Sequence, residues 1–332
     1  MLVLLGISLL LSGMLVSWAP LSSAPIVISA HEMCLNHCPT SRHALYLKAL
    51  VCGESLSAAG SAADLKSAFI KTGLIHLLVV SGSHLICLEE LLSILLKSRR
   101  FRFIRGALIF CTLIFFALAT GASPPVLRSL FQWCLRHLQK RLGLKWSSSQ
   151  ILIAASALTL ATCRTQMALA SLSLSWLAAI GIRLWSDQES DKSRRPNPFG
   201  LRAAFEKLRS AAALNVCVYL ALAPALWPLG IPHPLSILFN LALAPVIGLV
   251  LFPLSLVTFF PGFAHDPIEF LMRAVDGAWD LSLWAIQKAA DFTPQPAERE
   301  PVSLLWILLY ILLLSFFTFA RDRQKRADWK PS

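Results

Sequence analysis

The sequence predicts an all-α protein, a polytopic membrane helix bundle with broken or re-entrant helices. Of its 332 residues, 56% are hydrophobic and only 14% are charged, and the mean hydropathy is +0.65. Several stretches approach the roughly 20 apolar residues that cross a hydrocarbon core. Because backbone polar groups cannot stay unpaired in lipid, and because these stretches lack the alternation of a strand, we expect each of them to be a helix.

The apolar stretches divide the chain into four parts. We expect a first transmembrane helix at 1–20, a short outer loop at 21–72, a helical core at 73–320 and a basic cytoplasmic tail at 321–332. Within the core, the apolar stretches lie at 74–96, 106–120, 126–138, 150–163, 167–185, 211–230, 234–260, 268–290 and 302–320. A signal peptide that ends near Ser23 is the alternative for 1–20, although no basic residue precedes its apolar run.

Positive charges between the apolar stretches indicate which loops face the cytoplasm, because Lys and Arg are preferentially retained there. Four basic clusters are expected inside, at 97–105, 136–145, 183–209 and 321–330. The stretch 261–300 carries seven acidic residues against three basic ones, and 21–72 is nearly balanced, so we expect both outside. The net charge of +12 says little about a nucleic-acid partner, since this bias alone produces it.

If 211–230 and 234–260 both crossed the membrane, the acidic stretch 261–300 would lie inside and the basic tail outside. One of the two stretches is therefore not a simple span. A broken or re-entrant helix in 234–260 is the simplest solution, because Pro245, shortly after Asn240, lacks a backbone donor and collides with the preceding turn. Such a break is tolerated at membrane depth only where it lines protein or water. A break at the prolines of 211–230 is the alternative.

Two histidines and two serines surround a glycine in the apolar run Gly73 to Leu85, GLIHLLVVSGSHL. Ionisable groups at membrane depth cost roughly a few kcal/mol and are expected to face a bundle interior or a water-filled path. We therefore predict that His76, Ser81, Gly82 and His84 line a path. The alternatives are a neutral His76 bonded to a neighbouring helix and a Gly82 that allows either close helix contact or a break in the backbone.

Arg128 follows two prolines at the start of a short apolar helix. It is either an interfacial arginine or a cation on a translocation path, where its guanidinium can hold a phosphate through two N–H groups and cannot lose its proton. Asn240 either caps backbone groups freed by Pro245 or lines the same path. Ser171 and Ser175, which share a helix face, are expected to mediate close helix contact.

The eight cysteines divide between apolar helices and the outer loop. Cys34, Cys38 and Cys52 lie in the predicted outer loop, where oxidising conditions allow one disulfide and leave one thiol, and the sequence does not choose the pair. His31 and His37 lie beside two of these cysteines, but the spacing matches no zinc site, and no nucleotide-binding or zinc-protease motif is present. We therefore predict no metal, no cofactor and no enzymatic activity.

Four stretches of the chain resemble elements of one known family in the same order. GLIHLLVVSGSHL resembles the GLSHLLAISGLH signature of the competence protein ComEC family, the DNA-uptake channels of the bacterial inner membrane. GASPPVLRS at 121–129 is similar to the small-residue turn and arginine of that family, LSLSWLAAIGI at 172–182 to its FQLSFLAVLGI element, and FNLALAPVIGLVLFPL at 239–254 to its asparagine and proline element. The resemblance implies a competence-type transmembrane channel core at 73–320.

The function implied by the resemblance is passage of single-stranded DNA across the bacterial inner membrane in natural transformation, through a multi-pass channel. Candidate lining residues are Ser81, His84, Arg128 and Asn240, with His76, Gly82 and Pro245 beside them. Besides single-stranded DNA and membrane lipid, the implied partners are a separate DNA receptor, a nuclease, a cytoplasmic motor and further copies of the chain. Separate chains are expected because the outer and nuclease domains that the family commonly carries do not fit in 21–44 or after 320.

Two other classes of function remain open at this point. One is a secondary transporter of a small anion, in which broken helices place their dipoles at a midplane site. The other is an intramembrane enzyme that uses His76 or His84 as acid or base.

Overall fold

A computed structural model describes residues 20–55, 61–78, 80–98, 104–163, 166–190, 201–226, 233–259 and 265–294, together with 310 and 313. The described residues form helices and no β-strand, which confirms the all-α prediction. Apart from residue 20, the predicted first transmembrane helix lies outside the described residues, and so does the basic tail.

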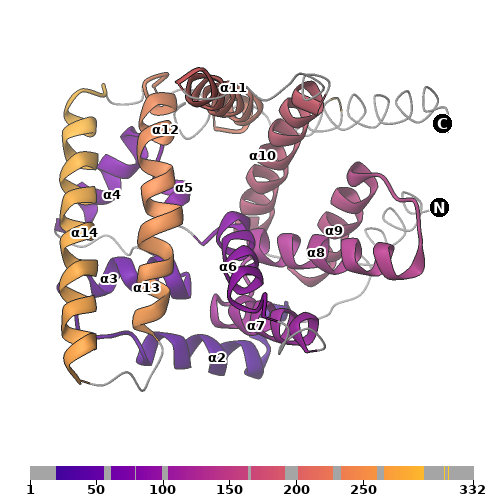
Figure 1. Cartoon of the computed structure of the whole chain (residues 1–332), viewed down its shortest axis with the longest axis horizontal. Helices are drawn as coiled ribbons and strands as arrows, with labels where there is room; N and C mark the ends of the chain where they lie inside the picture. The colour runs from indigo at the N-terminus through magenta and orange to yellow at the C-terminus, as the bar shows by residue number, and fades with distance from the viewer. Residues whose placement is uncertain are drawn as a thin grey trace.

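The helices follow one another closely along the chain. The α-helices are α2 (Pro25–Asn36), α3 (Ala44–Leu47), α4 (Ser61–Lys71), α5 (Ile75–Leu78), α6 (Gly82–Leu95), α7 (Arg105–Ala119), α8 (Pro124–Leu142), α9 (Ser148–Thr162), α10 (Gln166–Ser190), α11 (Leu201–Leu226), α12 (Ser236–Val246), α13 (Phe252–Thr258) and α14 (His265–Asp291). A 3-10 turn, η1 (Leu21–Ser23), precedes α2, and two π-helical turns, η2 (Lys48–Cys52) and η5 (Ile247–Leu251), follow α3 and α12. Figure 1 shows α14 beside a column formed by α12 and α13, with α8, α9 and α10 on the other side of α6.

One hydrophobic core joins the N-terminal helices to the C-terminal ones. Leu50 of η2, Phe69 of α4, Leu113 of α7 and Trp279 of α14 are completely buried in it. The described residues of 21–72 are therefore largely helical and contribute to the core, whereas a loop is expected from the sequence. Its helices are too short for their apolar spacing to stand out in the sequence, and its position outside the membrane stays a prediction.

The predicted apolar stretch 74–96 is two helices, because α5 ends at Leu78 and α6 starts at Gly82. Ser81 is the N-cap of α6, and its main-chain N–H donates to His84 Nδ1 at 3.0 Å, which satisfies a donor at the helix start. The 14 residues of α6 make a helix of about 21 Å at 1.5 Å per residue, shorter than the roughly 30 Å of a hydrocarbon core. A broken helix is thus present, and the break lies at Ser81.

The column formed by α12, η5 and α13 stays helical from Ser236 to Thr258. The separation into two half-helices that the sequence predicts around Asn240 to Pro245 is not observed. The interruption is instead the π-helical turn η5, where the Phe252 N–H donates to Ile247 O, one residue further back than in an α-helix. A proline removes only one donor, so the turns on either side keep the column continuous.

Helices α10 and α11 form the most extensive helix pair. A Cβ at Gly181 would lie 3.0 Å from Val218 Cα and 3.1 Å from Cys217 O, so a glycine stands where the two backbones meet. Within the described residues, Phe205–Leu226 and Ser236–Thr258 are long and apolar enough to cross a membrane, and only 11% and 17% of their most apolar windows are buried. Few residues of these windows are thus buried inside the protein.

Candidate functional site

The starts of α6 and α8 meet in what we call the α6–α8 junction. Pro124 and Pro125 begin α8, where their missing N–H groups have no intrahelical partner to lose. A Cβ at Gly82 would lie 2.0 Å from Ser129 Oγ and 3.3 Å from Pro125 O, so only glycine fits between the two helices. Gly82 therefore allows close helix contact, one of the two roles that the sequence offers for it.

Arg128 lies in the α6–α8 junction and is almost completely enclosed, with 7% of its surface exposed. Its Nε donates to Ser175 Oγ of α10 at 3.0 Å, its Nη1 to Gln132 Oε1 at 3.0 Å and its Nη2 to Ser129 Oγ at 3.3 Å. The guanidinium thus links α8 to α10. Three neutral oxygens surround it.

No acidic side chain balances the positive charge of the α6–α8 junction among the described residues. Neither α6 nor α8 has an acidic residue in its first turn, where an acid would balance the partial positive charge of a helix N-terminus. No carboxylate pairs with Arg128 in the part of the chain that the structure describes. A buried cation that has only neutral partners remains without a counter-charge, and a phosphate is one group that supplies it.

His84 is buried beside the junction, with 2% of its surface exposed. Because His84 Nδ1 accepts the Ser81 N–H, the proton of the neutral ring lies on Nε2. The ring packs against Phe252 of α13, with 4.7 Å between the ring centroids. His84 therefore joins the start of α6 to the α12–α13 column.

His76, by contrast, is an exposed residue of the short helix α5. Its Nδ1 donates to Gly73 O at 2.9 Å, a bond within its own turn. The alternative of a bond to a neighbouring helix is therefore not observed among the residues that the structure describes.

Asn240 and Pro245 lie on α12, which is not one of the helices that form the junction. Asn240 Nδ2 donates to Ser236 O at 2.8 Å within the same helix, and its buried Oδ1 has no partner among the described residues. Pro245 is exposed. The structure thus brings Ser81, Gly82, His84 and Arg128 together and leaves these two residues apart.

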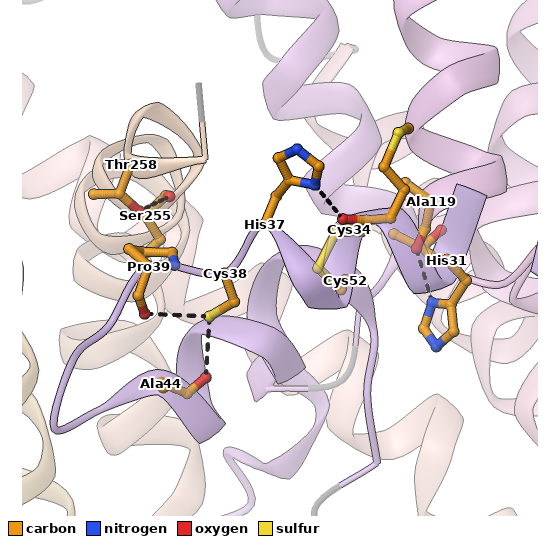
Figure 2. The surroundings of a disulfide bond; sticks show 12 residues. His31, Cys34, His37, Cys38, Pro39, Ala44, Cys52, Ala119, Ser255 and Thr258 are labelled. Atoms are coloured by element: carbon orange, nitrogen blue, oxygen red, sulfur yellow. Dashed lines mark hydrogen bonds between the residues drawn. A yellow bond between two sulfur atoms is a disulfide. The ribbon is translucent and has the colours of Figure 1, made fainter. Parts of the chain in front are cut away.

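The structure selects one cysteine pair from the three candidates: Cys34 and Cys52 form a disulfide, and Cys38 is free (Figure 2). The bond joins α2 to η2 across 18 positions of sequence. The Cys38 Sγ lies 3.7 Å from both Pro39 O and Ala44 O, and burial raises the pKa of this thiol, with Glu54 adding to the effect and Lys48 opposing it.

The histidines near these cysteines bond to main-chain oxygens. His31 Nδ1 donates to Ala119 O at 2.9 Å, and His37 Nδ1 donates to Met33 O at 2.8 Å (Figure 2). The His31 side chain therefore anchors α2 to the end of α7. The His37 side chain closes the last turn of α2. No group of three or more metal-ligating residues occurs within the described part of the chain.

A polar contact between the outer segment and α14 was not predicted. Ser41 Oγ donates to Asp276 Oδ1 at 2.6 Å, and His43 Nε2 donates to Asp280 Oδ1 at 2.9 Å. Arg42 forms an ion pair with the same Asp280. The two segments that loop charges place outside the membrane are thus in contact.

Sequence reasoning also missed the partners of Arg128. Gln132 stands four residues after Arg128, a spacing at which side chains meet on a helix, so this pair was visible in the sequence. Ser175 was expected only to mediate helix contact, and no local signal connects it to a residue 47 positions earlier. That bond depends on how α10 crosses α8.

Comparison with known proteins gives one match. No curated protein and no solved structure matches the chain. The model of the family described as Competence protein matches residues 57–324, which is most of the chain and includes every helix of the α6–α8 junction. The chain therefore belongs to the Competence protein family.

Proposed function

We propose that the chain is the core of a multi-pass channel that carries single-stranded DNA across the bacterial inner membrane into the cytoplasm. Membership of the Competence protein family connects the chain with DNA uptake and with the membrane. The observation that carries the finer proposal is Arg128, a buried cation with neutral partners only, where two helix N-termini meet.

The chemistry of the α6–α8 junction fits a passing phosphodiester. Arginine presents N–H groups in a planar fork that matches phosphate oxygens. Serine hydroxyls and the Gln132 amide can exchange their bonds to Arg128 for bonds to a phosphate or water, at little cost, because no ion pair must be broken. A site of this kind attracts a charge without trapping it, which transport requires.

The exposed apolar surface supports the membrane part of the proposal. Leu220 of α11 is 59% exposed and Leu249 of η5 is 70% exposed. Both belong to the stretches that are long and apolar enough to span a bilayer. Lipid is the partner that makes this exposure favourable.

The proposed topology places 21–72 and 261–300 outside and the basic clusters in the cytoplasm. The contacts of Ser41 and His43 with α14 support a common side for the two segments, and the Cys34–Cys52 disulfide suits an oxidising compartment. The chain acts with a separate DNA receptor, a nuclease and a cytoplasmic motor, and as a homo-oligomer.

Transformation frequency in a clean deletion strain tests the proposed function. We expect loss of transformation by added DNA, restoration by the intact gene, and normal transformation when DNA enters by electroporation. Normal transformation of the deletion strain by added DNA would overturn the proposal.

A secondary transporter of a small anion is the second candidate, because the buried Arg128 is also suited to a free phosphate. Uptake of inorganic phosphate by liposomes that contain the purified chain, without any DNA, would favour the transporter. The enzyme alternative has less support, since His76 and His84 both use Nδ1 in bonds within their own turns.

A further inference from the structure

Helix α8 carries a row of cationic and polar side chains that begins at Arg128. The members, four residues apart, are Arg128, Gln132, Arg136 and Lys140, and we call them the α8 ridge. Residues at this spacing are neighbours along a helix surface, and each step advances about 6 Å along the axis. The row therefore offers hydrogen-bond donors at regular intervals over most of α8.

The α8 ridge runs from the protein interior to the surface. Arg128 is buried and Gln132 is half-buried, and the two are bonded at 3.0 Å. Arg136 and Lys140 are exposed. Neither forms an ion pair with any described residue. The exposed end of the ridge thus keeps its charges available to an anionic partner.

We propose that the α8 ridge is the surface along which the phosphates of a single strand leave the α6–α8 junction for the cytoplasmic side. The inference rests on the proposed function and names the element that guides the strand. A polyanion with regularly spaced charges is the partner that a regular row of donors fits. Anionic lipid headgroups at a bilayer surface would account for the exposed end alone and not for the continuation of the row to the buried Arg128.

The adjacent row of residues on α8 supplies a matched control. Arg141 follows Lys140 directly and is equally exposed, but it continues the row of Trp133 and His137. The rings of these two residues pack 3.8 Å apart, and Trp133 also stacks on Phe110 of α7. If these charges served only to keep the segment in the cytoplasm, substitution of Lys140 and of Arg141 would have the same effect. The ridge proposal predicts weaker DNA binding for the substitution of Lys140 and not for that of Arg141.

The test is the salt dependence of DNA binding by the intact chain. The purified protein in phosphatidylcholine nanodiscs is titrated with a labelled oligothymidylate over a range of salt, as wild type and as Arg136→Gln, Lys140→Gln and Arg141→Gln. Each ridge variant should bind severalfold more weakly, and the slope of log K against log salt should fall by about 0.7, the value per phosphate contact on a single strand. Arg141→Gln should match the wild type.

Each other outcome overturns the inference in a recognisable way. Equal losses in all three variants would mean general electrostatic attraction, and no loss would mean that the strand does not touch the ridge. The same titrations are repeated in nanodiscs that contain phosphatidylglycerol, and weaker oligonucleotide binding by the ridge variants in these nanodiscs alone would assign the ridge to lipid. Failure of the wild type to bind the oligonucleotide would count against the proposed function as well.

Discussion

At the scale of single residues, the Arg128 side chain is suited to two roles, a link between helices and the binding of an anion. Its bond to Ser175 joins two helices, and its charge stays uncompensated within the described structure. A hydrogen bond to a charged group is worth about 1.5–3 kcal/mol. A role in helix contact and a role in anion transport are therefore both compatible with the geometry, and substitutions must separate them.

Replacement of Arg128 by alanine should lower transformation by about ten- to hundredfold, the equivalent of roughly 1.5–3 kcal/mol for a lost charged hydrogen bond. Arg128→Lys should be impaired too, since lysine lacks the planar fork. Transformation frequency and protein level in the membrane are measured together.

Ser175→Ala is the control for the Arg128 substitutions, because it removes the bond between α8 and α10 and keeps the cation. It should transform far better than Arg128→Ala. Equal defects in the two variants, with less protein in the membrane, would show that Arg128 acts only as a helix link.

Gly82→Ala should destabilise the chain by about 1–3 kcal/mol through overpacking, because its Cβ would lie 2.0 Å from Ser129 Oγ. Thermal unfolding in detergent measures the effect. Addition of Ser129→Ala should restore part of the loss, since it removes the colliding oxygen. If Gly82→Ala unfolds at the wild-type temperature, the close contact of α6 and α8 is wrong.

Part of the site could be predicted from the sequence at this scale. Ser81, Gly82, His84 and Arg128 stand out as polar or small residues in apolar runs, and the structure gathers them. The roles differ from the simplest expectation: His84 caps a helix, and Asn240 bonds within α12. Burial and partners of these residues depend on contacts between distant helices, which a local pattern does not contain.

At the scale of elements, breaks in helices proved harder to locate than helices themselves. The helix was expected to break at Pro245 because proline lacks a backbone donor. The column of α12, η5 and α13 nevertheless continues past Pro245 through the π-helical turn η5. The break lies instead between α5, which ends at Leu78, and α6, where Ser81 is the N-cap and a histidine three residues later accepts its main-chain N–H. Capping by His84 is uncommon, so the sequence offered this break only weakly.

Helix α14 has one buried face and one exposed face. Trp279 is completely buried and its ring stacks on Tyr46 of α3 at 5.5 Å, whereas Trp284 is 58% exposed. Trp279→Ala should therefore cost about 3–5 kcal/mol of unfolding free energy. Trp284→Ala should change it by about 0.5 kcal/mol or less. Thermal unfolding of the two variants in detergent decides, and similar losses would contradict the orientation of α14.

At the scale of the whole molecule, the N-terminal segment and α14 form one unit through the core and through Asp280. We therefore expect both segments, together with the Cys34–Cys52 disulfide, to face the same side of the membrane. The α6–α8 junction is joined to α10 by the bond from Arg128 to Ser175 and to α13 by the contact of His84 with Phe252. The chain thus places its buried cation between a proposed outer part and the basic end of α8.

Cysteine labelling in intact cells tests this topology. An introduced cysteine at Phe292, which is 76% exposed at the end of α14, should react with a membrane-impermeant maleimide. One at Lys325 in the basic tail should react only after the membrane is permeabilised. The reverse pattern would invert the proposed arrangement of the two sides.

The central claim is that single-stranded DNA passes the α6–α8 junction, and photo-crosslinking in transforming cells tests it most directly. A benzophenone amino acid replaces Ser175, the partner of Arg128, or Leu249, which is 70% exposed on η5. Labelled DNA should be captured at position 175 in a form that a single-strand-specific nuclease digests, and little should be captured at position 249. Absence of capture at 175, or equal capture at the two positions, would contradict the claim.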